Sequence, residues 1–263
     1  MPFVPIRGVG SEGLVTDQDA YNLELTQFPA GNNVSFHDGR LGKALGYVEE
    51  IAVAAAPTHV QSWLYAGNNT LVVGTLNKIY RFDGSSVSNV TKTSDATNYA
   101  NSTRWQSAQI GVAVLMNNGS QAPQYMYPSG TRFADLPAWP STLISACVKP
   151  YKSFLIMAGY ELGSSKYPYT VRWSDAYDPA SVPSDYDISS TTNLAGENIL
   201  SGNNGELIDQ LTLNNSQIIY AERGVFAMDF VGAPFVFNFR EIFADDGLMN
   251  RGACASFVNS HLV

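Results

Sequence analysis

Acidic residues gather at two places in the sequence where paired carboxylates could do acid–base chemistry. The longer segment, WSDAYDPASVPSDYD, carries four of them, Asp175, Asp178, Asp185 and Asp187; the shorter one, FADDG, carries Asp245 and Asp246. Two suitably spaced carboxylates can hydrolyse a glycosidic bond, and several converging oxygens can bind calcium. Neither segment matches the Ser-x-Asp-x-Gly-x-Thr-Trp box of sialidases, and aspartates commonly cap turns. We expect turn capping, with an acid pair or a calcium site as the alternatives.

The sequence lacks the motifs of the common nucleophilic, zinc-dependent and nucleotide-dependent enzymes. It contains no Gly-Lys-Ser phosphate loop, no GxGxxG after a strand, no GxSxG elbow and no HExxH. The histidines His37, His59 and His261 are far apart, and each is interpreted as a turn or surface residue. We therefore predict no catalytic residue, no metal ligand and no cofactor, and we expect a protein that is not an enzyme.

The two cysteines, Cys147 and Cys254, both stand in apolar segments. The N-terminal segment MPFVPIRGVGSEGL lacks the apolar core of a secretory signal, and no apolar run approaches the roughly 20 residues of a membrane span. We expect buried free thiols, with a disulfide as the alternative, and no insertion of this chain into a membrane.

Charge is sparse and its balance is acidic. Lysine and arginine number 15 against 23 aspartates and glutamates, for a net charge of −8, and charged residues are only 14% of the 263. A protein that grips nucleic acid needs a basic face, and none is apparent. The many uncharged polar residues, with 22 glycines and 13 prolines, favour short strands joined by uncharged turns over a helical bundle.

One sequence pattern returns along residues 51–263. It is an apolar strand, a short polar turn, and a strand with alternating aromatic and polar residues, closed by a Gly or Asp turn. The apolar strands stand at VQSWLY and LVVGT, then GVAVLM, FLIMAG and QIIYA, with a last copy beginning at Ala253. The period of roughly 40–60 residues is near that of propeller blades. We predict an all-β fold of β-propeller-like antiparallel blades, with a sandwich or barrel as the alternative, and tryptophans (Trp63, Trp105, Trp139, Trp173) packing between them.

Residues 1–50 read differently, as an extended arm before the propeller-like body of residues 51–263. Prolines and glycines punctuate this segment. Asp17–Leu25 is predicted to form a helical turn or short helix with Asp17 as N-cap, and His37–Arg40 a hairpin turn. Because the sequence stops at Val263 within an apolar run, we expect the propeller to be incomplete at that end; the alternative is a terminal strand tied into a sheet.

The arm and two later segments resemble a known family. The arm carries Phe28-Pro29-Ala30-Gly31, then the phrase NVSFHDGR at residues 33–40, then Lys43 and Gly46; the later segments are VRWSDAYDP and IIYAERGVFAMDFVGAPFVFNFREIFADDGLMNRGA. They are similar to segments of the tail nozzle proteins of short-tailed bacteriophages, also called tail tubular or packaged-DNA-stabilising tail hub proteins. Members of that family are usually much longer than 263 residues.

The resemblance implies a structural role in the virion tail, after assembly in the host cytoplasm. Nozzle proteins form homo-oligomeric rings, commonly of six subunits, below the portal and adaptor proteins. They retain the packaged DNA and conduct it during ejection, so double-stranded DNA would pass without specific binding. The arm would then contact the ring or the adaptor, with Phe28, Phe36 and Arg40 as interface residues; the alternative is that these residues pack on their own chain.

Two other functions remain open at the level of the sequence. One is a carbohydrate-binding or glycan-degrading propeller, which requires paired acids and exposed aromatic residues. The other is a generic scaffold propeller that lacks any dependence on the arm.

Overall fold

The computed structural model describes residues 8, 10–38, 40–44, 46, 51–92, 99, 105–200 and 202–263. The chain divides into two compact units, Met1–Glu50 and Ile51–Val263, called unit 1 and unit 2 below and described separately. The described residues are all-β and form several antiparallel sheets, as the sequence predicts. Among them, no helix has the length and the apolar character to cross a membrane.

Unit 1 contains two small pairs of strands. β1 (Gly13–Leu14) pairs in parallel with β2 (Gln27–Phe28), and β3 (Val34–His37) forms an antiparallel hairpin with β4 (Arg40–Lys43). The predicted turn after His37 is confirmed, because His37 and Arg40 are register partners and Asp38 takes a φ of 49°. An aspartate tolerates this left-handed conformation better than most residues.

The sequence predicts a helical turn or a short helix over Asp17–Leu25, and the structure has only a turn. It is a single 3-10 turn, η1 (Ala20–Asn22), preceded by Asp19 rather than Asp17, and Asp19 makes no capping bond through its side chain. Tyr21 in this turn is 97% exposed. Short helices depend on packing an apolar face, and none of the residues of η1 is buried.

Among its described residues, unit 2 contains four successive sheets of four or five strands and then a two-stranded hairpin. Strands follow one another in meander order, except that the first two strands of the third sheet both pair its third strand. We number the four larger sheets sheet 1 to sheet 4. Sheet 1 comprises β5 (Pro57–Tyr65), β6 (Asn68–Thr75), β7 (Ile79–Phe82) and β8 (Val87–Asn89). Sheet 2 comprises β9 (Gln106–Ile110), β10 (Ala113–Asn117), β11 (Gln124–Met126) and β12 (Ala134–Asp135).

The third and fourth sheets follow the same plan. Sheet 3 comprises β13 (Leu143–Ile144), β14 (Val148–Tyr151), β15 (Phe154–Leu162), β16 (Ser165–Trp173) and β17 (Gly196–Ile199), with β13 and β14 both pairing β15. After a 3-10 turn, η3 (Gly202–Asn204), sheet 4 comprises β18 (Leu207–Leu213), β19 (Ser216–Ala221), β20 (Gly224–Phe230) and β21 (Phe237–Ala244).

The apolar runs GVAVLM, FLIMAG and QIIYA become strands that are buried on both faces, whereas VQSWLY becomes the largely exposed strand β5. In β10, Val114 lies in the cluster shared with sheet 1 and Leu115 in the cluster shared with sheet 3. In β15, Leu155 joins the cluster with sheet 2 and Ile156 the cluster with sheet 4. Because successive side chains of a strand point to opposite faces, a sheet between two others needs a continuous apolar run rather than an alternating one.

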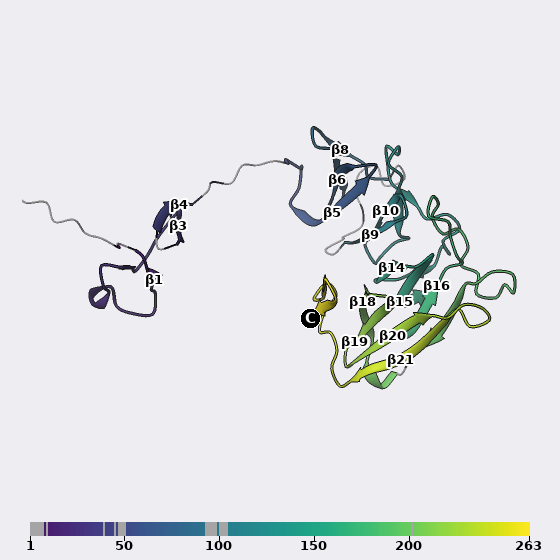
Figure 1. The fold of residues 1–263 in the computed structure, drawn as a ribbon. Helices are drawn as coiled ribbons and strands as arrows, with labels where there is room; N and C mark the ends of the chain where they lie inside the picture. Colours follow the sequence, from purple (N-terminus) through teal and green to yellow (C-terminus); the bar gives the residue numbers. More distant parts are fainter. Residues whose placement is uncertain are drawn as a thin grey trace, which may run out of the picture. The chain divides into compact units, whose positions relative to one another are not determined.

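The sheets are stacked in chain order, and one strand of each lies beside its counterpart in the next sheet. β5 lies against β9, β9 against β14, and β14 against β18; we call these four the inner strands. Figure 1 shows the sheets of unit 2 following one another along an arc, with the inner strands on its inner side. Within the described residues the sheets do not close into a barrel or a propeller.

The four tryptophans pack in the interior, as predicted. All are buried, and each indole N–H donates to a backbone carbonyl. Two of these bonds tie sheet 1 to sheet 2: Trp63 donates to Val112 O at 3.2 Å, and Trp105 donates to Thr75 O at 2.7 Å. Gly74 leaves the space that the Trp105 ring occupies, since a Cβ there would lie 2.7 Å from Trp105 Cδ1.

A hairpin follows sheet 4. The strand predicted to begin at Ala253 is shorter than expected: β22 (Ala255–Phe257) turns at Val258, whose φ is 35°, and pairs antiparallel with β23 (Ser260–Leu262). β22 lies against β18, so the hairpin continues the series of inner strands.

Candidate functional site

A hollow of about 340 Å³ lies where the inner strands meet. Every inner strand contributes to it, as does the segment before β22. Its lining is largely polar and consists of Thr58, His59, Trp105, Gln106, Ser107, Lys149, Asp209, Arg251, Gly252 and Cys254. We call it the inner-strand hollow. It is the place in unit 2 where polar groups from the most sheets converge.

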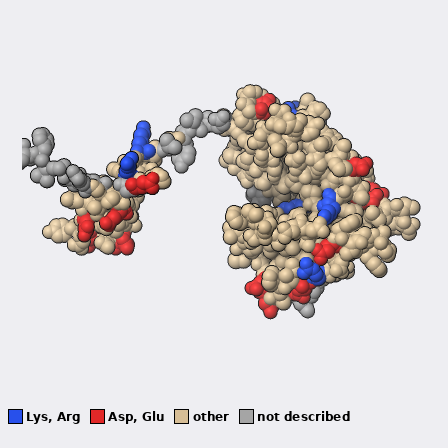
Figure 2. Space-filling model, in the orientation of Figure 1, with Lys and Arg blue, Asp and Glu red and all other residues tan. Residues whose placement is uncertain are grey.

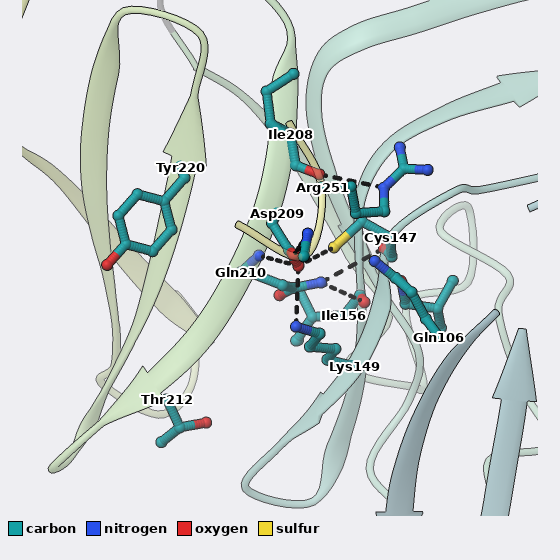
Figure 3. Close-up of polar contacts among 12 residues, drawn as sticks. Gln106, Cys147, Lys149, Ile156, Ile208, Asp209, Gln210, Thr212, Tyr220 and Arg251 are labelled. Atoms are coloured by element: carbon teal, nitrogen blue, oxygen red, sulfur yellow. Dashed lines mark hydrogen bonds and ion pairs between the residues drawn. The ribbon is translucent and has the colours of Figure 1, made fainter. Parts of the chain in front are cut away.

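Asp209 is the central charge of this hollow, as Figure 3 shows. It projects from β18 and is 1% exposed. Its Oδ1 lies 2.9 Å from Lys149 Nζ on β14 and accepts from the backbone N–H of Gln210 at 2.8 Å. Its Oδ2 accepts from the N–H of Gly252 at 2.9 Å. One carboxylate thereby joins sheet 3, sheet 4 and the segment leading into β22.

Burial and pairing have opposite effects on this carboxyl group. Burial alone would raise the pKa of Asp209, but the Lys149 ammonium and the N–H donors of Gly252 and Gln210 outweigh it and lower the pKa. Asp209 is therefore ionised at neutral pH, and its charge is compensated inside the protein.

Two thiols lie beside the same carboxylate. Cys147 Sγ is 3.4 Å from Asp209 Oδ1, and Cys254 lines the hollow. Both cysteines are free, as predicted. Burial, reinforced by the Asp209 charge, raises the pKa of Cys147 to about 12 and that of Cys254 to about 11. Thiols with such pKa values are poor nucleophiles at neutral pH.

A chain of buried amides extends the contact between sheets 3 and 4. Gln210 Nε2 donates to Ile156 O of β15 at 2.9 Å, and Gln217 Nε2 donates to Gln210 Oε1 at 3.0 Å. Both glutamines are fully buried. Since an unpaired buried amide is costly, these bonds specify one register between the two sheets.

A serine and a histidine also meet in the hollow, but not as a catalytic pair. His59 Nε2 lies 2.6 Å from Ser107 Oγ, and Ser107 Oγ donates to Gln61 Oε1 at 2.6 Å. A hydroxyl has a single proton, so His59 must be the donor to Ser107 rather than the base that removes its proton. Burial lowers the pKa of His59, and the three side chains join sheet 1 to sheet 2.

The predicted acidic segments form turns. Asp175 Oδ1 accepts from Leu194 N at 2.8 Å, Asp185 Oδ1 from Asp187 N at 2.9 Å, and Asp187 Oδ1 from Ser189 N at 2.9 Å. The Asp185 and Asp187 bonds are the turn capping that the sequence analysis favoured, whereas the Asp175 bond joins residues 19 positions apart. Asp245 has a φ of 68° in the turn after β21, and Asp246 lines a separate hollow. No group of three or more potential metal ligands occurs among the described residues.

A second polar hollow, of about 380 Å³, contains carboxylates that the sequence analysis did not single out. It is lined by Tyr160, Glu161, Lys166 and Glu206, with Arg251 shared with the inner-strand hollow. Glu161 is paired with Lys166 at 2.9 Å. These glutamates are distant in sequence and carry no motif, so only the packing of sheet 3 beside β18 brings them together.

The three predicted interface residues all lie in unit 1. The rings of Phe28 and Phe36 are 6.0 Å apart and half-buried, and Gly10 lies under them, where a Cβ would come within 2.4 Å of the Phe28 ring. Arg40 is exposed at the start of β4. The two phenylalanines therefore form the small core of unit 1, and Arg40 is presented to solvent.

The other histidines have different surroundings. His37 is exposed beside Asp38. His261 bridges the C-terminal hairpin to sheet 4, since its Nδ1 lies 2.8 Å from Tyr220 OH and its Nε2 3.1 Å from Thr212 O. These two contacts with sheet 4, rather than a local turn at the surface, hold His261 in place.

Asp209 and Lys149 were missed by the sequence analysis, although a signal existed. Asp209 interrupts the apolar strand LIDQLTL, and a buried carboxylate needs a partner. The sequence does not show which cation pairs with Asp209.

Comparison with protein-family models finds no matching family, and comparison with curated proteins finds no matching relative.

Proposed function

We propose that this chain is a structural virion protein, a subunit of the tail nozzle or hub ring of a short-tailed bacteriophage. The observation that carries the proposal is that the polar groups of the inner-strand hollow bond one sheet to another. Asp209, Lys149, Gln210 and the Ser107–His59 pair are all engaged in bonds between sheets. Such a geometry suits a scaffold that must hold its shape, and it offers no activated nucleophile.

The kind of scaffold is suggested by the arm. Its phrase around Phe28, Phe36 and Arg40 resembles nozzle proteins, and we propose that sheets 1 to 4 are blades of a propeller-like body. The meander order of sheets 1, 2 and 4 and the row of inner strands support this architecture. Propellers place the first strand of each blade nearest the axis and leave few exposed edges.

Sparse charge suits a protein that DNA must pass. Figure 2 shows unit 2 with isolated basic and acidic groups among uncharged residues on the face in view. A conduit rich in lysine and arginine would bind phosphates, whereas an acidic chain with a net charge of −8 repels them. We propose that the ring retains packaged DNA and conducts it during ejection without specific binding.

The partners follow from this role. The chain would form a homo-oligomeric ring, of six subunits by the family resemblance, and meet portal or adaptor proteins and other tail proteins. Arg40, exposed on β4, is the residue of unit 1 that we assign to such a contact. The chain would be assembled in the host cytoplasm and reside in the virion tail.

The test is a nonsense mutation in the gene of the phage that encodes the chain, with a suppressor host as control. We expect particles made without the protein to package DNA and then lose it. DNase-resistant DNA per particle would therefore drop at least about tenfold, and purified wild-type tails would contain the protein by mass spectrometry. Particles that keep their DNA and infectivity without it would overturn the proposal.

A glycan-binding propeller is the second candidate, and the hollow lined by Tyr160, Glu161 and Glu206 favours it. Carboxylates beside an aromatic ring are typical of sugar sites. Under this alternative, Glu161→Gln and Glu206→Gln would abolish binding or cleavage of capsule polysaccharide. Asp175→Asn serves as control, because Asp175 accepts from the backbone of Leu194 and does not line this hollow.

A further inference from the structure

The two terminal sheets of unit 2 leave an apolar face without a neighbouring sheet. In β10 of sheet 2 and β15 of sheet 3, successive residues enter two different apolar clusters, one on each face of the sheet. In sheet 1 only one face does so: Trp63, Val72 and Ile79 pack against sheet 2. The register of β5 to β8 places Ser62, Leu71, Phe82 and Val87 on the opposite face, with Val60 and Leu64 on the same side of β5.

We call this surface the leading face, made of Val60, Leu64, Leu71, Phe82 and Val87. Leu64 is 57% exposed, Val60 and Val87 are also exposed, and Leu71 and Phe82 are half-buried. No charged residue is among them. The same side of sheet 1 also carries the hydrogen-bonded pair Ser62 and Asn69, and Val73 and Tyr80, which are buried. Exposed apolar side chains grouped on one side of a sheet mark an interaction site.

The far face of sheet 4 is covered only in part. Ile218, Tyr220 and Val225 form an apolar cluster with Leu248, and the hairpin β22–β23 lies over this side through the His261–Tyr220 bond. A largely apolar hollow of about 540 Å³ remains beside the hairpin, lined by Leu213, Ile218, Val225, Ile242 and Phe243 among others.

The hairpin itself turns apolar residues outward. His261 faces sheet 4, so the register of β22 with β23 places Phe257 and Leu262 on the side away from it. Phe257 is 68% and Leu262 73% exposed. With Phe243, Val258 and Val263, which are exposed too, they form the trailing face; Asp246 lies beside Phe243 and Val263 in the same hollow.

We propose that the leading face of one copy of this chain docks on the trailing face of a second copy. Within unit 2 the same kind of contact occurs three times, each joining the far face of one sheet to the near face of the next. Docking between copies would repeat this kind of apolar contact and cover the exposed side chains of sheet 1 and of the hairpin β22–β23. The absence of charge among the leading-face residues fits the core of such a contact.

The contact is head-to-tail, because its two surfaces are different patches of the same chain. A heterologous contact generates a ring if its rotation closes and a filament if it does not. The inference rests on the proposed function in one respect, that a nozzle requires a ring; the surfaces themselves are assigned from unit 2 alone.

The experiment uses the full chain and two variants that each block one surface. Leu64→Lys blocks the leading face and Phe257→Lys the trailing face, and each is measured by sedimentation equilibrium from 1 to 100 µM. We expect the wild-type chain to associate and each variant alone to be at least about 100-fold weaker, since burying a lysine against an apolar surface removes a central contact. Ile199→Lys is the control, because Ile199 is also 73% exposed but lies on β17.

Mixing the variants tests the head-to-tail geometry. Leu64→Lys keeps its trailing face and Phe257→Lys its leading face, so together they should form a 1:1 dimer and nothing larger. Formation of this dimer also shows that both variants are folded.

Three results would overturn the inference. The first is a wild-type chain that stays monomeric at 100 µM. The second is an association that both variants leave intact, which removes these surfaces but leaves a ring possible through others. The third is a pair of variants that does not complement although circular dichroism shows both to be folded. None of these results bears on DNA retention by the particle, so failure here is distinguishable from failure of the proposed function.

Discussion

At the scale of single residues, Asp209 determines how two sheets and the following segment meet. It is a buried carboxylate that accepts from Lys149, Gln210 and Gly252. Replacing a buried ion pair by apolar residues is often harmless, but removing one partner leaves an uncompensated charge. The consequence can be measured at this position.

Asp209→Asn should lower the free energy of unfolding by about 3 kcal/mol at pH 7, because the partly buried Lys149 then lacks its counter-charge. Urea denaturation followed by tryptophan fluorescence measures it. Glu161→Gln is the control: its pair with Lys166 is exposed, and its loss should cost below about 1 kcal/mol. Equal effects of the two variants would contradict the assigned role.

The same residue predicts a pH dependence. The pKa of Asp209 is lower in the folded chain than its ordinary value, which is about 3.9 in unfolded chains. The stability it contributes is therefore present above about pH 4 and is lost as the pH falls through the folded-state pKa. The Asp209→Asn chain should show a shallower loss of stability below pH 4 than the wild type; a parallel decline would contradict this.

Cys147 should be nearly inert in the folded protein. With a pKa of about 12, its thiolate fraction at pH 8 is about a thousandfold smaller than that of an ordinary thiol with a pKa near 8.5. Iodoacetamide labelling at pH 8, mapped by mass spectrometry, should be at least that much slower than in urea. Cys254 is half-buried and should react before Cys147; equal rates in the folded and unfolded chain would contradict burial.

At the scale of elements, the contacts between sheets depend on side chains that fit into neighbouring strands. Trp105 lies over Gly74 and is held there by its hydrogen bond to Thr75 O. Its ring cannot move aside without losing that bond, so the position of Gly74 is sensitive to an added carbon.

Gly74→Ala should destabilise unit 2 by about 1–3 kcal/mol through overpacking, because its Cβ would lie 2.7 Å from Trp105 Cδ1. Gly202→Ala is the matched control, since a Cβ there would lie 3.4 Å from the Tyr169 ring, an ordinary contact. Thermal unfolding by circular dichroism compares the two. A Gly74 variant as stable as the control would show that sheet 1 can shift away from sheet 2.

At the scale of the whole molecule, unit 1 and unit 2 can be tested independently. All four tryptophans lie in unit 2, so tryptophan fluorescence reports on that unit alone. The Phe28–Phe36 pair lies in unit 1, where its removal should act on the arm.

The double variant Phe28→Ala, Phe36→Ala should leave the fluorescence-detected stability of unit 2 within about 0.5 kcal/mol of wild type. Its incorporation into virions should nevertheless fall at least about tenfold, because the arm is the proposed ring or adaptor contact. Quantitative mass spectrometry of purified particles measures incorporation. Normal incorporation would favour a scaffold that does not depend on the arm.

The sequence by itself determined the fold class and the positions of the main strands. Apolar runs such as GVAVLM and FLIMAG specify buried strands whatever the neighbours are, and Asp or Gly turns delimit them. It also predicted the interior tryptophans, the free thiols and the turn-capping aspartates, because these depend on residue type and local spacing. Of the helical turn or short helix predicted over Asp17–Leu25, only the turn Ala20–Asn22 forms, and Asp17 does not cap it; a longer helix needs a partner surface that the sequence does not show.

Only the tertiary structure decided which distant residues meet. Asp209 and Lys149 are 60 positions apart, and Glu161 and Glu206, which line one hollow, are 45 positions apart. The order in which sheets stack, and which faces of sheets 1 and 4 stay uncovered, follow from the packing of inner strands. The preference of each residue for helix or strand does not predict these contacts, because they form when surfaces from separate segments are buried together.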